Sequence, residues 1–154
     1  MKKIAIAVAA LAAVAASPAL ANEGRVEARG GIAWADGDSE GTAGVAAGYD
    51  WTVGSGTFIG AEVTGDKILT DGAKVSFGIN ARGGAQLSNG TKLYVSGGWN
   101  SEPCDLCDDA VSLGAGAEFP LVNRLYGKIE YRHFFAGNGF TDTNAVVAGV
   151  GVRF

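Results

Sequence analysis

The sequence predicts an all-β protein, an eight-stranded antiparallel up-and-down transmembrane β-barrel. Three observations support this prediction. Apolar residues recur at every second position through eight separate segments, which is the period of a strand with two unlike faces. Most of these segments span about 9 to 12 residues, the length that a tilted membrane strand requires. The connections between them alternate between tight turns and longer polar loops, as in barrels that cross a membrane.

Residues 1–21 precede the first of these segments and have the composition of an export signal. Lys2 and Lys3 are followed by an unbroken apolar run, and Ser17-Pro-Ala-Leu-Ala21 then ends in the small-x-small pattern that signal peptidase reads. A transmembrane anchor is the alternative, but the apolar run is shorter than the roughly 20 residues of a spanning helix. We expect cleavage after Ala21, which leaves residues 22–154 as one barrel domain.

The eight predicted strands follow one another through the rest of the chain. In chain order they cover residues 25–34, 43–51, 59–63, 75–87, 93–99, 111–119, 125–131 and 146–154. Each has one face of apolar or glycine residues, without a single charge, and an opposite face that carries the charged residues. The apolar side chains are Val26, Ala28, Ile32 and Trp34; Ala43, Val45, Ala47, Tyr49 and Trp51; Ile59, Ala61 and Val63; Val75, Phe77, Ile79, Ala81, Ala85 and Leu87; Leu93, Val95 and Trp99; Val111, Leu113, Ala115, Ala117 and Phe119; Leu125, Ile129 and Tyr131; and Val146, Ala148, Val150, Val152 and Phe154.

The connections distinguish a membrane barrel from a soluble β-sandwich, whose strands also alternate between apolar and polar residues. Tight turns are expected at residues 53–57, 88–91 and 120–124, the second of them with the Asn-Gly pair of a hairpin. Longer polar loops are expected at residues 36–42, 66–72, 101–109 and 136–142. Soluble strands centre on about 5 to 6 residues, and a closed barrel is the only sheet that leaves no open edge in lipid. The barrel is therefore the favoured architecture.

The charged faces of the strands predict a polar barrel interior. An unpaired charge in a confined interior costs several kcal/mol, so we expect acids and bases on neighbouring strands to pair. The residues expected in this ion network are Glu62, Lys74, Arg82, Lys92, Glu118, Lys128, Glu130 and Arg132. An eight-stranded barrel is just wide enough for side chains to fill it. A plugged lumen is therefore favoured over a selective pore lined by rings of charge.

Two cysteines form the one conspicuous short motif, Cys104-Asp-Leu-Cys107. A redox site would need a strand-to-helix context, and a zinc site would need more than two ligands. In an exported chain a disulfide between Cys104 and Cys107 is the favoured interpretation.

Acidic residues crowd the longer loops, and the whole chain has a net charge of -4 and a pI of about 4.9. Carboxylates suit divalent cations, but no twelve-residue ligand loop is present. A solvated, repulsive rim without a metal is favoured. The acidic balance also argues against nucleic acid as a partner.

Two segments carry a resemblance to a known family. The stretch Ile129-Glu-Tyr-Arg-His133 and the terminal strand 146–154 resemble the small eight-stranded outer-membrane proteins of Gram-negative bacteria, the opacity-protein or OmpA-like porin-family group. His133 departs from the pattern, because relatives usually carry an aromatic residue there. The end of the chain, with Val150, Val152 and Phe154, resembles the signal read by the barrel-assembly machinery.

The resemblance implies a monomeric protein in the bacterial outer membrane, in contact with outer-membrane lipids and lipopolysaccharide, with no cofactor. A structural or surface-interaction role with a plugged lumen is the favoured function. A narrow porin for small solutes is one alternative. A lipid-modifying enzyme is another, because some small outer-membrane barrels are lipid A deacylases with a His and a Ser on a late strand. Here the residue two positions after His133 is Phe135, which is no nucleophile, so no catalytic residue is assigned.

Overall fold

The computed structural model describes residues 22–104, 107–137 and 141–154. The expected export signal, residues 1–21, lies outside the described residues. The strands are β1 (Glu23–Ala35), β2 (Asp38–Gly54), β3 (Thr57–Ile68), β4 (Val75–Gln86), β5 (Lys92–Asn100), β6 (Ala110–Pro120), β7 (Leu125–Ala136) and β8 (Thr143–Arg153). Within the described ranges, no helix has the length and apolar character needed to cross a membrane.

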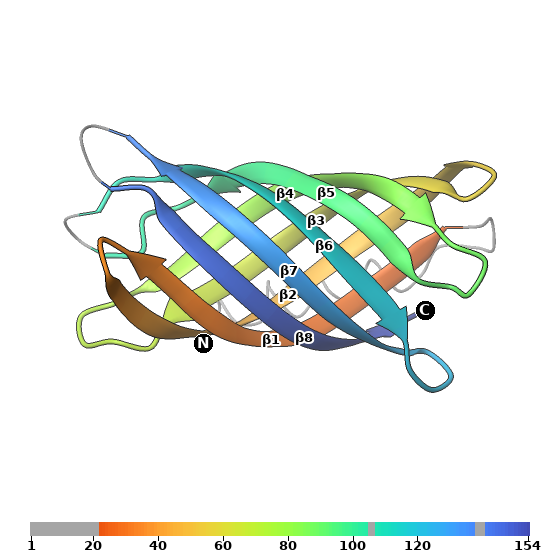
Figure 1. Cartoon of the computed structure of the whole chain (residues 1–154), viewed down its shortest axis with the longest axis horizontal. Coiled ribbons are helices and arrows are strands. Elements are labelled where there is room, and N and C mark those ends of the chain that lie inside the picture. Colours follow the sequence, from red (N-terminus) through yellow and green to blue (C-terminus); the bar gives the residue numbers. More distant parts are fainter. Residues whose placement is uncertain (1–21, 105–106, 138–140) are drawn as a thin grey trace, which may run out of the picture.

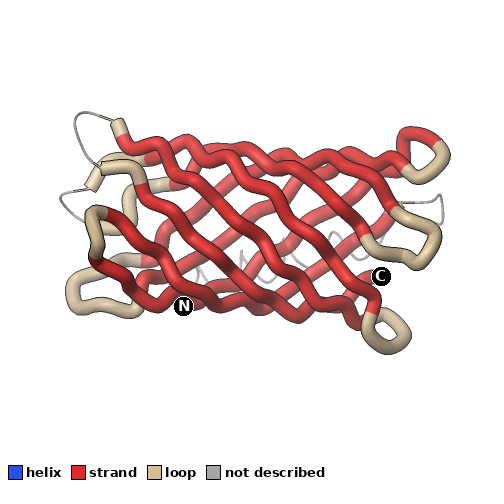
Figure 2. Tube along the Cα trace, viewed as in Figure 1, coloured by secondary structure: helices blue, strands red, loops and turns tan. Residues whose placement is uncertain are grey.

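Each strand pairs antiparallel with the next, and β8 pairs with β1 to close a barrel (Figure 1). The prediction of an eight-stranded antiparallel barrel is confirmed. Figure 2 shows the strands running obliquely around the barrel, with the connections gathered at its two ends. The closure joins the two ends of the barrel domain, because Gly24 and Phe154 exchange two backbone hydrogen bonds of 2.9 Å each.

The two ends of the barrel differ. One end, here called the turn end, holds the β2–β3, β4–β5 and β6–β7 connections together with Phe154 (Figure 1). The opposite end, here called the loop end, holds the β1–β2 connection and the longer segments 69–74, 101–109 and 137–142. Three of the four connections at the loop end are therefore longer loops, as predicted.

The remaining connection corrects the sequence prediction. A loop was expected at residues 36–42, but only Asp36 and Gly37 separate β1 from β2. Both have positive φ, 50° and 92°, which is the backbone of a tight two-residue hairpin turn that Asp-Gly favours. Asp38 and Glu40 consequently belong to β2. The polar composition of this segment misled the loop prediction.

The exterior of the barrel is apolar and its interior is polar. Large hydrophobic side chains on the outer face are 36 to 65% exposed. They include Ile32, Val45, Ile59, Val63, Phe77, Ile79, Val95, Leu113, Ile129 and Val150. Buried positions are instead dominated by charged and polar residues. Water would oppose this arrangement, whereas a hydrocarbon surrounding favours it.

Candidate functional site

The barrel interior contains fourteen charged side chains that form ion pairs with one another, here called the interior charge network. All eight strands contribute to it. The basic members are Arg25, Arg29, Arg82, Lys92, Lys128, Arg132 and Arg153, and the acidic members are Glu23, Glu27, Asp50, Glu62, Asp66, Glu118 and Glu130. Seven positive and seven negative charges therefore balance within the described part of the chain.

Glu62 on β3 lies at the centre of this network. Its carboxylate is 2.7 Å from Arg25 Nη1, 2.9 Å from Arg132 Nη2 and 3.4 Å from Arg29 Nη1. These guanidinium groups come from β1 and β7, which are not neighbours of β3 in the barrel. The pairs therefore span the lumen rather than link adjacent strands. All four side chains are at most 4% exposed.

A second set of pairs fills the turn end. Arg82 donates to Asp50 Oδ1 and Oδ2 at 2.9 and 2.5 Å, and it also pairs with Glu118. Lys92 Nζ donates to Asp50 at 2.8 Å and to Glu23 at 2.6 Å. Such two-pronged arginine–carboxylate contacts are among the stronger and more directional hydrogen bonds in proteins.

Glu130 on β7 anchors the wall between β5 and β7. It accepts hydrogen bonds from Arg132 Nε at 2.6 Å and from Tyr94 Oη and Ser96 Oγ at 2.9 Å each. Lys128 Nζ lies 3.2 Å from Oε2 of the same carboxylate. The carboxylate is thus satisfied from several sides while it is almost fully buried.

Three aromatic side chains inside the barrel were not singled out from the sequence. Phe58, Tyr94 and Tyr126 are 3%, 5% and 0% exposed. The guanidinium carbon of Arg82 lies 5.3 and 4.8 Å from the ring centres of Phe58 and Tyr94, an arrangement that stabilises a cation. Tyr126 Oη donates to Glu27 at 2.7 Å. In the sequence, these aromatic residues occupy the same alternate strand positions as the charged residues, and this pattern predicts that they face inward.

Inward glycines leave space for these long side chains. A Cβ at Gly48 would lie 2.7 Å from Arg25 Nη2, and one at Gly116 would lie 2.5 Å from Tyr94 Oη. Both distances are shorter than van der Waals contact, so a side chain at either position would displace a member of the packed interior.

The structure places seven of the eight residues expected in the lumen inside the barrel, and Lys74 is the exception. Lys74 is exposed and precedes β4, which begins at Val75. Its backbone N–H donates to Pro103 O, 2.8 Å away, in a neighbouring loop. Lys74 shares the parity of the inward residues of β4, but it lies before the strand begins, so parity alone does not place it in the lumen.

Asp66 corrects the prediction in the opposite direction. It was expected in a loop, but β3 continues to Ile68, so Asp66 keeps the inward parity of Glu62. Arg29 Nε donates to its Oδ1 at 2.8 Å. With Asp66 and Glu23 inside and Lys74 outside, the interior charge network holds seven basic and seven acidic residues.

The loop end carries the disulfide and most of the exposed acids. Cys104 and Cys107 are disulfide-bonded, with their Cα atoms 5.1 Å apart. Some acids bond to neighbouring groups: Asp109 accepts from Trp99 Nε1 at 2.5 Å, and Asp36 accepts from Thr141 Oγ1 at 2.6 Å. Across the described residues, no three His, Cys, Asp or Glu side chains are grouped closely enough to hold a metal ion.

His133 lies on the outer face of β7 near the loop end. Its Nδ1 is 2.8 Å from Asn144 Oδ1 and its Nε2 is 3.3 Å from Asp142 Oδ2. The Phe135 ring packs edge-on against the imidazole ring, with the two ring centres 4.5 Å apart. These contacts tie β7 to the start of β8, which is a structural arrangement.

The comparison with protein families decides the identity of this barrel. Residues 6–154 match the model of the outer membrane protein beta-barrel domain. The chain belongs to this outer-membrane β-barrel family. The apolar exterior accordingly faces the hydrocarbon of the bacterial outer membrane, and the location expected from the resemblance is confirmed. The comparison with curated proteins yields no match.

Solved members of the outer-membrane barrel class share the fold at low sequence identity. Neisserial surface protein A is 13% identical, with 90% of this chain and 100% of that chain covered and a TM-score of 0.59. The attachment invasion locus protein Ail of Yersinia pestis is 12% identical, covering 86% and 97%, with a TM-score of 0.56. The N-terminal β-barrel of Pseudomonas aeruginosa OprF is 14% identical, covering 84% and 97%, with a TM-score of 0.54. These similarities establish the fold.

Proposed function

We propose that this protein is an outer-membrane barrel with a closed lumen that serves a structural or surface-interaction role and does not conduct solutes. The observation that supports the proposal most strongly is the position of Glu62. Guanidinium groups from the strands across the lumen meet at its carboxylate. An eight-stranded barrel leaves an interior only as wide as its side chains, and here those side chains interlock at the centre.

The energetics of the interior charge network also support a closed lumen. A continuous water path would require the separation of buried pairs such as Arg25–Glu62 and Arg132–Glu62, whose side chains are at most 4% exposed. Removing one partner from a buried pair typically costs about 3–5 kcal/mol. Spontaneous opening of the centre is therefore rare.

Liposome swelling tests this proposal. Vesicles that contain the purified protein should swell in isotonic solutions of small sugars or amino acids no faster than empty vesicles. A general porin reconstituted in parallel supplies the positive control. Swelling of the protein-containing vesicles at a rate that rises with protein density would replace the closed lumen by the narrow porin.

The surface role concerns the loop end. Among the described residues of this end, seven exposed acids outnumber the exposed Lys67 and Lys74 and give the surface a negative charge: Asp36, Asp38, Glu40, Asp71, Glu102, Asp109 and Asp142. Two of the similar barrels are a surface protein and an attachment protein by name. For this chain, the charge favours cationic over anionic surface partners. Binding of polylysine to cells that express the protein should exceed that to cells without it, and equal binding would exclude this preference.

We propose that the chain inserts as a monomer and that its end serves as the assembly signal. Phe154, Val150 and Val152 lie on the outer face and are 40%, 56% and 39% exposed. Each strand is paired on both sides, so no edge is left for pairing with a second copy. Size determination in detergent should give one chain per micelle.

The proposal assigns no catalytic role. The contacts of the His133 ring nitrogens are with Asn144 and Asp142, whereas acyl transfer requires a nucleophile beside the base. Mass spectrometry of lipid A from cells with and without the protein tests this assignment. A change in lipid A mass that depends on the protein would favour the enzymatic alternative instead.

A further inference from the structure

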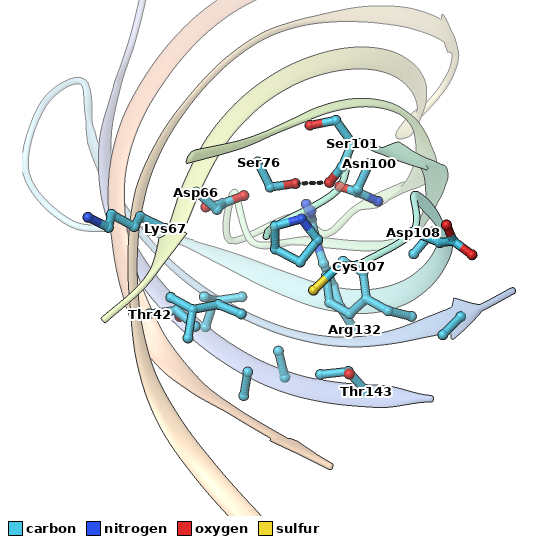
Figure 3. Close-up of a pocket in the computed structure, with 18 of the residues that line it drawn as sticks. Thr42, Asp66, Lys67, Ser76, Asn100, Ser101, Cys107, Asp108, Arg132 and Thr143 are labelled. Atoms are coloured by element: carbon cyan, nitrogen blue, oxygen red, sulfur yellow. Dashed lines mark hydrogen bonds between the residues drawn. The ribbon is translucent and has the colours of Figure 1, made fainter. Parts of the chain in front are cut away.

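The two halves of the lumen are filled differently. The interior charge network occupies the centre and the turn end, while the inward positions near the loop end carry small or uncharged residues such as Ala33, Thr42, Ser76 and Ala110. Short side chains leave space between the strands. A partly open cavity of about 240 Å³ lies there, inside the barrel wall at the loop end (Figure 3).

The wall of this cavity has two unlike sides. The contiguous strands β7, β8 and β1 provide the apolar side, with Phe134, Ala136, Ala145, Val147 and Ala33. The opposite strands β2 to β5 provide the polar side, with Thr42, Asp66, Ser76 and Asn100. A molecule that fits must therefore be amphipathic, with a ring or chain toward one side and a polar group toward the other.

The floor of the cavity is formed by Arg29, Arg132 and Asp66. Both arginine side chains are almost fully buried and engaged, Arg29 with Asp66 and Arg132 with Glu62 and Glu130. The Asp66 side chain, in contrast, is 32% exposed. Figure 3 shows it directed toward the cavity, whereas neighbouring Lys67 points away. The most accessible charged group of the floor is thus a hydrogen-bond acceptor.

We propose that this cavity binds a small aromatic alcohol, a single ring that carries one hydroxyl group. An engineered apolar cavity of about 150 Å³ holds benzene, so a cavity of about 240 Å³ accommodates a substituted ring. The ring packs against Phe134 and Val147, as aromatic and aliphatic surfaces favour. The hydroxyl donates to Asp66. This activity goes beyond a structural role and requires no passage through the barrel.

Fluorine NMR with 4-fluorophenol tests the proposal, with the protein in lipid nanodiscs. Empty nanodiscs of the same lipid account for partition of the probe into the membrane. We expect a saturable shift or broadening of the fluorine signal only in the presence of protein. Fluorobenzene lacks the hydroxyl donor and should bind about tenfold more weakly, the effect of losing one hydrogen bond of about 1.4 kcal/mol.

Two tryptophan substitutions on β8 provide a matched pair. Ala145→Trp fills the cavity and should abolish saturable binding, while Ala148→Trp, on the exposed outer face, should leave it unchanged. Heat-modifiability on gels verifies that each variant forms a barrel. If Ala145→Trp does not form one, Ala33→Leu replaces it as the cavity-filling variant. Absence of saturable binding to the wild type, equal binding to both variants, or equal affinity for fluorobenzene would each overturn the proposal.

Discussion

Replacing Glu130 by alanine removes a carboxylate from the middle of the packed interior. Glu130 is 1% exposed and accepts hydrogen bonds from Arg132, Tyr94 and Ser96 at 2.6 to 2.9 Å. Lys128 Nζ lies 3.2 Å away. The substitution leaves seven positive charges facing six negative ones and deprives two hydroxyl groups of their acceptor.

The expected loss of stability follows from these contacts. Leaving a buried charge without its partner costs about 3–5 kcal/mol. Removing Arg132 as well restores the charge balance, so the double variant Glu130→Ala/Arg132→Ala should be less destabilised than the sum of its two single variants. The difference between that sum and the loss in the double variant measures the coupling between Arg132 and Glu130, whose Nε and Oε1 atoms lie 2.6 Å apart.

Reversible urea unfolding in lipid vesicles supplies the measurement. Glu130→Ala should lower the urea midpoint markedly, whereas Ile129→Val, on the outer face at 49% exposure, should change the free energy of unfolding by about 1 kcal/mol or less. A Glu130→Ala midpoint equal to that of Ile129→Val would refute the buried ion network, as would strict additivity in the double variant.

Three further predictions concern the outer face, the chain end and the orientation. Ala115→Arg places a charge on the exposed face of β6 and should cost about 2–4 kcal/mol in the same unfolding assay; no change there would mean that this face does not meet hydrocarbon. Deletion of Phe154 should reduce the amount of protein in the outer membrane far more than it lowers the stability of a refolded barrel, and normal membrane levels would contradict the assembly role. After reduction of Cys104–Cys107, an impermeant thiol reagent should label intact cells, because we expect the loop end, with its longer connections, to face outward as in other outer-membrane barrels; labelling only of broken cells would reverse the orientation.

The sequence predicts which face each strand residue occupies, because a strand alternates with a period of two. Glu118, Lys128 and Glu130 consequently lie inside, as their parity requires, and Ile129 and Val150 lie outside. Errors arose where strands end. Lys74 and Asp66 both have the parity of interior residues. Lys74 precedes β4, as the predicted strand 75–87 already implied, whereas only the structure shows that β3 continues past Asp66 to Ile68.

Partner choice across the lumen was beyond the reach of the sequence. Parity places Glu62 inside, but its partners Arg25 and Arg132 follow from the stagger of the strands around the barrel. That stagger sets the height of each residue along the axis, and no local pattern encodes it. The loop-end cavity is hidden for the same reason, since its lining combines residues from all eight strands.

Single-channel recording in planar bilayers tests the closed lumen most directly. The wild-type protein should show no steady conductance, while Arg25→Ala/Glu62→Ala, which removes the pair joined across 2.7 Å at the centre, should conduct small ions. Steady conductance of the wild type at the level of this double variant would contradict the account, because the interior would then already be a continuous water-filled pore.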